Sequence, residues 1–479
     1  MRKHSIRGLG LLPVLTGAVL ISAPALGADL AARPYTKAPP MMVQAYNWTG
    51  FYLGVNAGVG LGRSPAQLAT TAGTFETTRL SPFGAIGGAQ VGYNWQTSNF
   101  MGFGNVVFGI EADIQAAGLK DDRTCILLCV AGGPSATIEN KIDWFGTVRG
   151  RVGLATGSVL TYFTGGLAYG SVKTNITETV AGTATGIGMS GTRTGWTIGS
   201  GVEAALGGNW TGKIEYLYVD LGKQDATYVL TGVGHAYTSD IRQHIFRAGV
   251  NYRFGGGLNA PEPVANWNGL YLGANIGSAT ARNESSLQAG LVTERFNLSP
   301  DGYIGGLQMG YNWQAANWVW GLETDIQGST QRENRGCLLS CSPAAFALMN
   351  QQMQWFGTVR GRVGYAVGQS LFYATGGFAY GDVKTGISEG LGGVPFNIEF
   401  SKVRTGYAVG GGIETPFDIF GLFGKNWTSK TEYLYVDLGK SSNSYAFNGV
   451  AHTFETKVQE HIFRTGLNYH FNTPISARY

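Results

Sequence analysis

The segment "KIDWFGTVRGRVGLA" (residues 141–155) is mostly small and apolar, yet it carries two arginines, Arg149 and Arg151, near its centre. It alternates with period two: the charged side chains fall on odd positions from 141 to 153, and apolar or small residues fill the even positions from 142 to 154. Side chains of a β-strand point alternately to its two faces. The segment therefore predicts a strand with one charged and one apolar face.

The same stretch returns at 352–366 as "QMQWFGTVRGRVGYA", within a duplication of the whole chain. "NWTGFYLGVNAG" (47–58) matches "NWNGLYLGANIG" (266–277), and "HIFRAGVNYRF" (244–254) matches "HIFRTGLNYHF" (461–471). We expect two copies of one unit, at 47–254 and 266–471, joined by the Gly- and Pro-containing linker 255–265.

The N-terminus predicts export. Residues 1–27 combine a basic start, an apolar run and small residues before Ala28, as in a secretory signal peptide, and the run is shorter than a spanning helix requires. A retained anchor helix is the alternative. An N-terminal extension (28–46) would follow the signal, and a tail (472–479) would close the chain.

Composition narrows the class of protein. Without the signal, the chain has 31 Lys and Arg against 30 Asp and Glu, so no nucleic-acid-binding surface follows from its charge. No later apolar run is long enough for a spanning helix. Glycine makes up 75 of 479 residues and aromatics 12%. An exported, glycine- and aromatic-rich chain favours an all-β surface protein.

Eight alternating segments occur in the first copy, near 49–62, 84–96, 104–118, 141–155, 159–173, 193–206, 209–223 and 241–254. The connections between them alternate between long (64–83, 119–140, 174–192, 224–240) and short (97–103, 156–158, 207–208). This alternation is typical of an antiparallel transmembrane β-barrel with short periplasmic turns and longer extracellular loops.

The charged faces are assigned to the barrel interior, because an Arg facing lipid at the bilayer midplane costs about 2–4 kcal/mol. In copy one the predicted lumen residues are Glu111, Asp113, Lys141, Asp143, Arg149, Arg151, Arg193, Glu203, Lys213, Glu215, Arg247 and Arg253. In copy two they are Glu323, Asp325, Arg360, Arg362, Arg404, Glu414, Lys430, Glu432 and Arg464.

The near balance of acids and bases predicts a network of ion pairs that fills a narrow lumen. Where the copies differ, Lys141 and Asp143 are replaced by Gln352 and Gln354. One cation and one anion disappear together, as expected of a pair.

With "WFGTVRGRVG", "TGGLAYG", "EYLYVDLG" and "RAGVNYRF", the chain resembles the small outer-membrane barrels of the OmpA-like and opacity-type porin group, in their surface-antigen branch. The resemblance covers nearly all of the chain, once per copy. It implies an outer-membrane location among lipid and lipopolysaccharide, an eight-stranded barrel, and insertion by the barrel-assembly machinery. Phe471 fits the aromatic end of the closing strand, although eight residues follow it, and Tyr479 is the alternative.

Two architectures fit an even number of strands in each copy. We favour two tandem eight-stranded barrels, each with a sealed lumen, and the alternative is one sixteen-stranded porin. The favoured function is a structural, surface-antigen role with at most weak porin activity. The sequence leaves the oligomeric state open.

The four cysteines form two C-x3-C pairs, Cys125 with Cys129 and Cys337 with Cys341. In an exported chain we expect two local disulfides. A shared zinc site is the alternative, and it would require four thiolates from loops far apart in sequence.

We expect neither catalysis nor a cofactor, because the histidines lack a Ser and acid at motif spacing. The resemblance leaves one alternative, capture of haemin at the extracellular rim by His235 and His244 and by His452 and His461. Adhesion through the loops is another.

Overall fold

The computed structural model describes residues 46–71, 73, 75–98, 100, 104–126, 135–180, 183–230, 232–254, 263–336, 341–342, 345–391, 394–417 and 424–471. The predicted signal peptide, nearly all of the predicted extension (28–46), most of the linker and the tail lie outside these residues. Among the described residues, no helix is long and apolar enough to cross a membrane.

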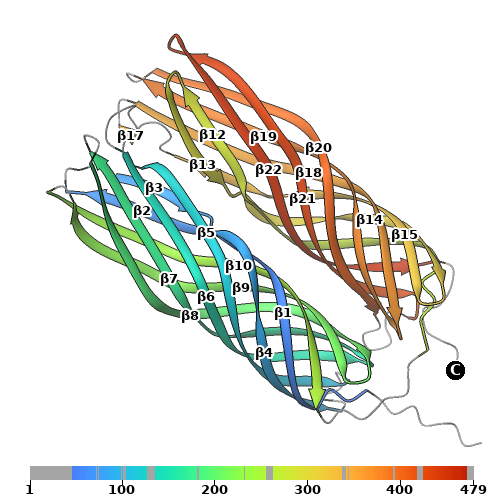
Figure 1. Cartoon of the computed structure of the whole chain (residues 1–479). Coiled ribbons are helices and arrows are strands. Elements are labelled where there is room, and N and C mark those ends of the chain that lie inside the picture. Colours follow the sequence, from blue (N-terminus) through green and yellow to red (C-terminus); the bar gives the residue numbers. More distant parts are fainter. Residues whose placement is uncertain are drawn as a thin grey trace, which may run out of the picture. The chain divides into compact units, whose positions relative to one another are not determined.

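The first copy closes into a ring of eight antiparallel strands in the order β1-β4-β5-β6-β7-β8-β9-β10, with β10 paired back to β1. The strands are β1 (Gly50–Gly62), β4 (Phe83–Thr97), β5 (Val106–Ile126), β6 (Ser135–Thr156), β7 (Val159–Val180), β8 (Thr183–Gly207), β9 (Trp210–Leu230) and β10 (Val233–Phe254). The hairpin of β2 (Ser64–Thr70) and β3 (Phe75–Leu80) adds to β10. We call this ring barrel 1; it is blue to green in Figure 1.

The second copy repeats the arrangement in barrel 2, yellow to red in Figure 1, where β22 pairs back to β11. Its ring is β11 (Gly269–Ala281), β14 (Asp301–Ala315), β15 (Trp318–Ser329), β18 (Ala345–Val367), β19 (Ser370–Leu391), β20 (Val394–Pro416), β21 (Trp427–Phe447) and β22 (Val450–His470). Four short strands accompany it: β12 (Asn283–Ala289), β13 (Val292–Leu298), β16 (Arg332–Arg335) and β17 (Cys341–Ser342). Each ring closes on itself, so the sixteen-stranded alternative is wrong.

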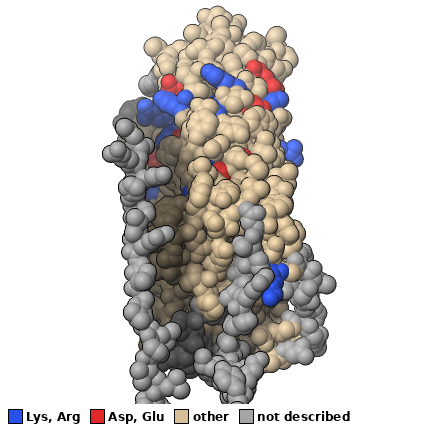
Figure 2. Space-filling model, turned by 90° about the vertical axis from the view of Figure 1, so that its right-hand side faces the viewer, with Lys and Arg blue, Asp and Glu red and all other residues tan. Residues whose placement is uncertain are grey.

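Each ring has one end at which the chain enters and leaves it, here called the terminal end. Next to this end, the outer wall of the ring carries an apolar band. On β1 the exposed side chains are Phe51, Leu53 and Val55, and on β8 they include Trp196 and Ile198. On β15 the exposed apolar side chains run from Trp318 to Ile326, close to the length of strand that crosses a bilayer. In Figure 2, charged side chains gather toward the upper end of the visible face, above a wall with few of them.

β-Bulges interrupt the ladders where the apolar band ends. The register shifts at Asp143 between β6 and β7, and at the same place in barrel 2 between Met353 and Trp355. In the repeated "DLGK" stretch, Gly222 has φ +76° and its N–H donates to Asp220 Oδ1 (2.8 Å). Only glycine adopts this conformation at little cost, which explains the motif.

Beyond the bulges the strands continue for about ten more residues. The connections 119–140, 174–192 and 224–240, predicted as long loops, are mostly strand, and 64–83 contains the hairpin β2–β3. That prediction was wrong because a bulge moves inward residues from odd to even positions. After Asp143 in the sequence, the buried residues of β6 have odd numbers, such as Phe145. Before Asp143 they have even numbers, such as Ile142 and Ile138. A strand predicted from strict alternation of inward and outward residues therefore ends at the bulge.

This distal part of barrel 1 is a sandwich rather than a closed ring. The β8–β9 ladder stops at Trp196–Asp220 and the β4–β5 ladder at Phe83–Lys120. Beyond these points the described strands form two sheets, β5-β6-β7-β8 and β9-β10-β2-β3. Their facing side chains form one apolar core of Ala66, Leu68, Leu80, Ala136, Ile138, Ile176, Tyr228 and Tyr237.

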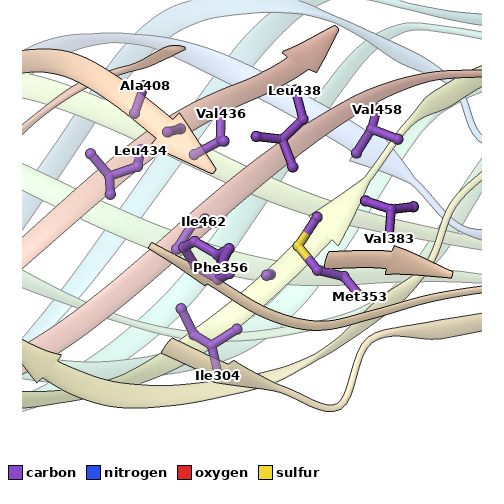
Figure 3. Packing of buried hydrophobic residues seen from close by; sticks show 12 residues of the cluster. Ile304, Met353, Phe356, Val383, Ala408, Leu434, Val436, Leu438, Val458 and Ile462 are labelled. Carbon is purple, nitrogen blue, oxygen red and sulfur yellow. The ribbon is translucent and has the colours of Figure 1, made fainter. Parts of the chain in front are cut away.

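The interior of each barrel is layered. Along β6 the inward side chains run from Arg151 and Arg149 through Phe145 and Ile142 to Ile138, so an apolar layer lies beyond the charged one. Figure 3 shows this layer in barrel 2, where Phe356, Met353 and Ile462 belong to one buried cluster.

Candidate functional site

The centre of the charged layer in barrel 1 is Arg149, on β6. Its guanidinium makes ion pairs with Asp113 on β5 (3.0 Å) and Glu215 on β9 (3.1 Å), and also contacts Glu111 on β5. All four side chains are buried. A guanidinium has five N–H donors in a planar fork, so one arginine can serve several carboxylates.

The charged layer also spans the full width of the lumen. Lys213 Nζ lies 3.0 Å from Glu111 Oε2. Lys213 is on β9 and Glu111 on β5, four strands apart in a ring of eight, so these strands face each other across the barrel. The side chains of opposite walls therefore meet near the axis.

Two further arginines complete the layer. Arg247 on β10 donates to Glu215 Oε2 (2.7 Å) and Asp113 Oδ2 (2.9 Å). Arg151 donates to Glu203 Oε2 (3.0 Å) and Asn94 Oδ1 (2.8 Å). Four cations thus meet four carboxylates: Arg149, Arg151, Lys213 and Arg247 with Glu111, Asp113, Glu203 and Glu215.

Neutral side chains supply donors that the sequence analysis missed. Tyr52 Oη donates to Glu111 (2.8 Å) and Tyr162 Oη to Glu215 (2.8 Å). Tyr162 lies flat over Gly201, where a Cβ would be 2.6 Å from its hydroxyl. Thr147 donates to Asp113 (2.8 Å). These residues carry no charge, so only their inward positions in the strands could have identified them from the sequence.

Barrel 2 repeats the layer residue for residue. Arg360 pairs with Glu323 (2.6 Å), Asp325 (3.0 Å) and Glu432 (3.0 Å), and Lys430 reaches across to Glu323 (2.8 Å). The other pairs are Arg362 with Glu414 (3.0 Å) and Arg464 with Asp325 (2.9 Å) and Glu432 (2.7 Å).

Aromatic side chains close the terminal end of both lumens. In barrel 1, Tyr46 and Trp48 are buried there, and the guanidinium of Arg253 lies over both rings, 4.9 and 5.2 Å from their centroids. In barrel 2, Trp267 is buried and His470 takes the place of Arg253, 3.3 Å from Glu414. The charged layer is therefore enclosed between an aromatic layer and an apolar layer.

Two predicted lumen residues, Lys141 and Asp143, lie elsewhere, whereas Arg193 and the buried Arg404 contact backbone carbonyls. Lys141 and Asp143 pair with each other (2.7 Å) on the outer surface, and Lys173 also contacts Asp143 (2.7 Å). The bulge at Asp143 turns them outward. Arg193 donates to the backbone carbonyl of Lys223 (3.2 Å). Arg404 donates to the carbonyls of Gly439 (3.5 Å) and Thr456 (3.4 Å).

The histidines do not form the pairs expected for haemin capture. His235 is buried in the distal sandwich, and His244 lies nine residues along β10 on the opposite face, against Tyr216 (2.8 Å). His452 and His461 repeat this arrangement on β22, with Tyr433 2.7 Å from His461. No single planar ligand can contact both histidines of a pair.

The cysteine prediction stays a prediction. Cys129 and Cys337 lie outside the described residues, as do the side chains of Cys125 and Cys341. In the described part of the chain, no three His, Cys, Asp or Glu side chains are grouped to hold a metal ion.

A family model described as the outer membrane protein beta-barrel domain matches residues 18–254 and again 256–471. The chain belongs to this family. It lies in the outer membrane, as its relatives' names state. Barrels of this class extend farther on the extracellular than on the periplasmic side, so the distal sandwich is extracellular and the terminal end periplasmic.

Two relatives illustrate the duplication. The 31 kDa outer-membrane immunogenic protein of Brucella melitensis is 35% identical over 247 residues, 50% of this chain but 96% of the relative. The 22 kDa outer membrane protein of Rhizobium leguminosarum bv. viciae is 36% identical over 181 residues, 38% of this chain and 68% of the relative. One relative thus corresponds to one barrel. The solved Neisserial surface protein A matches with 14% identity and a TM-score of 0.20, over 43% of this chain and 98% of its own.

Proposed function

We propose that this protein is a structural, surface-displayed component of the outer membrane whose two lumens are sealed. The observation that carries the proposal is the Lys213–Glu111 contact between opposite walls, with its counterpart Lys430–Glu323 in barrel 2. Side chains that meet at the axis support a lumen that is closed to water at that height.

The energetics of the layer support a closed state. Opening a path through it would separate buried ion pairs, and removing one partner of such a pair typically costs about 3–5 kcal/mol. The apolar layer beyond it would also have to be hydrated. A general porin instead needs an open lumen lined by water-exposed charges.

Liposome swelling tests the proposal. Vesicles containing the full chain should swell no faster in isosmotic arabinose or glycine than vesicles without protein. A known porin, reconstituted at the same ratio, checks the assay. Swelling that scales with the amount of this protein, and that falls with solute size, would overturn the sealed state.

The same proposal makes the extracellular sandwich of barrel 1, and the corresponding distal strands of barrel 2, the part presented to the surroundings. Relatives named immunogenic outer-membrane proteins support a surface-antigen role. Binding of antibodies against residues 174–194 to intact cells tests it. Labelling only after permeabilisation would contradict it.

We also propose that the barrel-assembly machinery inserts the protein. It would then be surrounded by lipid and lipopolysaccharide, and it would catalyse no reaction. The closing strand β22 ends in His470, followed by the exposed Phe471. Deletion of residues 472–479 should leave assembly intact if Phe471 ends the insertion signal. A loss of assembly would assign that role to the tail.

A further inference from the structure

The end of barrel 2 farthest from its terminal end carries exposed apolar side chains. Leu291, in the turn between β12 and β13, is 95% exposed, and Val394, at the start of β20, is 67% exposed. Leu391, at the end of β19, and Val450, at the start of β22, are also exposed. This end is extracellular, so the four side chains face the surroundings of the cell. We call residues 289–292, 390–391, 394–396 and 447–451 the barrel 2 tip.

Contacts between neighbouring hairpins join the tip into one surface. The Gly290 N–H donates to the carbonyl oxygen of Ala451 (3.2 Å), which places the β12–β13 turn beside the β21–β22 turn. Phe396 on β20 packs against Phe447 at the end of β21, with ring centroids 5.4 Å apart. The exposed apolar side chains therefore belong to one continuous patch, which is unusual for a surface in contact with water.

The tip carries no formal charge. Its described residues include no Asp, Glu, Lys or Arg. On β13, β20 and β22, the first charged side chains that reach the surface lie four or five residues behind the exposed apolar ones: Arg295, Glu399 and Glu455. At about 3.3 Å per residue, this separation is about 13–17 Å. Segments that rest in a membrane interface enter it by about 5–10 Å, a depth that covers the tip and leaves these charges in water.

The turns of the tip leave few backbone groups without a partner. β21 pairs with β22 up to Phe447 and Val450, so the turn contains only Asn448 and Gly449. Both have positive φ, 48° and 75°, as in the tight I′ turn of a β-hairpin. The turn between β12 and β13 also contains two residues. Lipid cannot hydrogen-bond to the backbone, so short closed turns are suited to entering it.

The size of the tip favours lipid over a protein as its partner. A stable protein interface buries about 800 Å² on each partner, far more than four aliphatic side chains provide. A fluid bilayer needs no complementary shape, and every aliphatic side chain that enters it leaves water.

Barrel 1 does not repeat this surface. By the alignment of the two copies, Thr183 takes the place of Val394 and Thr185 that of Phe396, and both threonines are exposed. On β9, Val229 is 73% exposed, but the exposed residue two positions before it is Thr227. The corresponding end of barrel 1 is thus more polar.

We propose that the barrel 2 tip inserts into a second lipid bilayer that approaches the cell surface, with Leu291, Leu391, Val394 and Val450 entering its interface. Barrel 1 takes no part in this contact. The inference rests on the proposed surface display and does not depend on sealed lumens. A nanodisc exposes the tip whatever its orientation in the cell, so binding measured there and antibody labelling of intact cells can fail independently.

Co-sedimentation of the full chain in lipid nanodiscs with sucrose-loaded phosphatidylcholine vesicles tests the proposal. The wild-type protein should sediment with the vesicles, whereas empty nanodiscs should stay in the supernatant. Raising the salt from about 0.1 M to about 0.5 M should not weaken binding, because salt screens charges and not apolar insertion. Heat-modifiable gel migration confirms that each variant is folded.

Three variants locate the contact. L291S should lower the partition coefficient about tenfold, because it removes a leucine that is almost fully exposed before insertion. V394T gives barrel 2 the residue of barrel 1 and should lower it about fivefold. V229T, at an exposed valine of barrel 1, is the matched control and should bind as the wild type does.

Two results would overturn the proposal. One is a wild-type protein that stays in the supernatant, which would leave an apolar protein surface as the occupant of the tip. The other is vesicle binding that L291S and V394T leave unchanged, because the contact would then be made elsewhere on the molecule.

Discussion

Barrels 1 and 2 share the centre of the lumen and differ at its ends. Arg149 with its three carboxylates has a counterpart in Arg360 with three carboxylates, and the cross-lumen lysine is present in both. At the periplasmic end, however, Arg253 over two aromatic rings corresponds to His470 beside Glu414. On the outer surface, the Lys141–Asp143 pair corresponds to Gln352 and Gln354.

The difference between centre and ends follows from the number of partners. Each central side chain serves two or three buried groups, so replacing it leaves several of them uncompensated. A surface pair has one or two exposed partners, and water replaces them at little cost. Substitutions in the two regions should therefore differ widely in effect, and to the same extent in both barrels.

The largest effect is expected from R149M and from R360M. Each removes a buried cation that serves three carboxylates, so each should lower the free energy of unfolding by about 3–5 kcal/mol. Urea unfolding in lipid vesicles, followed by heat-modifiable gel migration, measures it. A cost below about 1 kcal/mol in either barrel would contradict the account of the central layer.

The cross-lumen contact should show strong coupling. K213M removes the cation that reaches Glu111 from the opposite wall, and E111Q removes the charge that Lys213 contacts there, so each should cost about 2–4 kcal/mol. The double variant should cost less than the sum of the two by about 1–3 kcal/mol. The cycle of E323Q and K430M in barrel 2 is the matched comparison. Additive effects would mean that the opposing walls do not interact.

A smaller effect is expected at the periplasmic end. R253H converts barrel 1 to the residue of barrel 2 and removes a cation stacked on Tyr46 and Trp48, at a cost of about 1–2 kcal/mol. Unfolding in the same vesicles measures the change. A cost as large as that of R149M would mean that the periplasmic end of the lumen contributes as much to stability as the central charged layer.

The smallest effect is expected on the outer surface. K141Q combined with D143Q gives barrel 1 the residues of barrel 2, and these side chains are 44% and 27% exposed. The urea midpoint should not move measurably, because exposed ion pairs contribute little. A clear shift would show that the pair outside the barrel matters as much as those inside.

Much of the membrane-level structure followed from the sequence because one physical rule governs it. Arg149 and Arg151 had to face inward, and strict period two then placed Glu111, Glu203 and Lys213 on the same side. The neutral members of the layer, Tyr52 and Tyr162, carry no charge to mark them, so only the structure identified them.

Beyond the bilayer this rule no longer applies, and there the prediction failed. No lipid constrains which side chains face outward, and the single extra residue at Asp143 reverses the parity. Lys141 and Asp143 were assigned to the lumen for this reason. The extracellular strands were interpreted as loops because both of their faces contain polar residues, and period two was broken at their base.

Single-channel recording of the purified full chain in planar bilayers tests the sealed lumen most directly. We expect no steady openings at neutral pH, because ion pairs between opposite walls close each barrel at the level of Glu111 and Glu323. Steady openings that recur in every membrane containing the protein, and that are absent from membranes treated with a protein-free extract, would contradict this account.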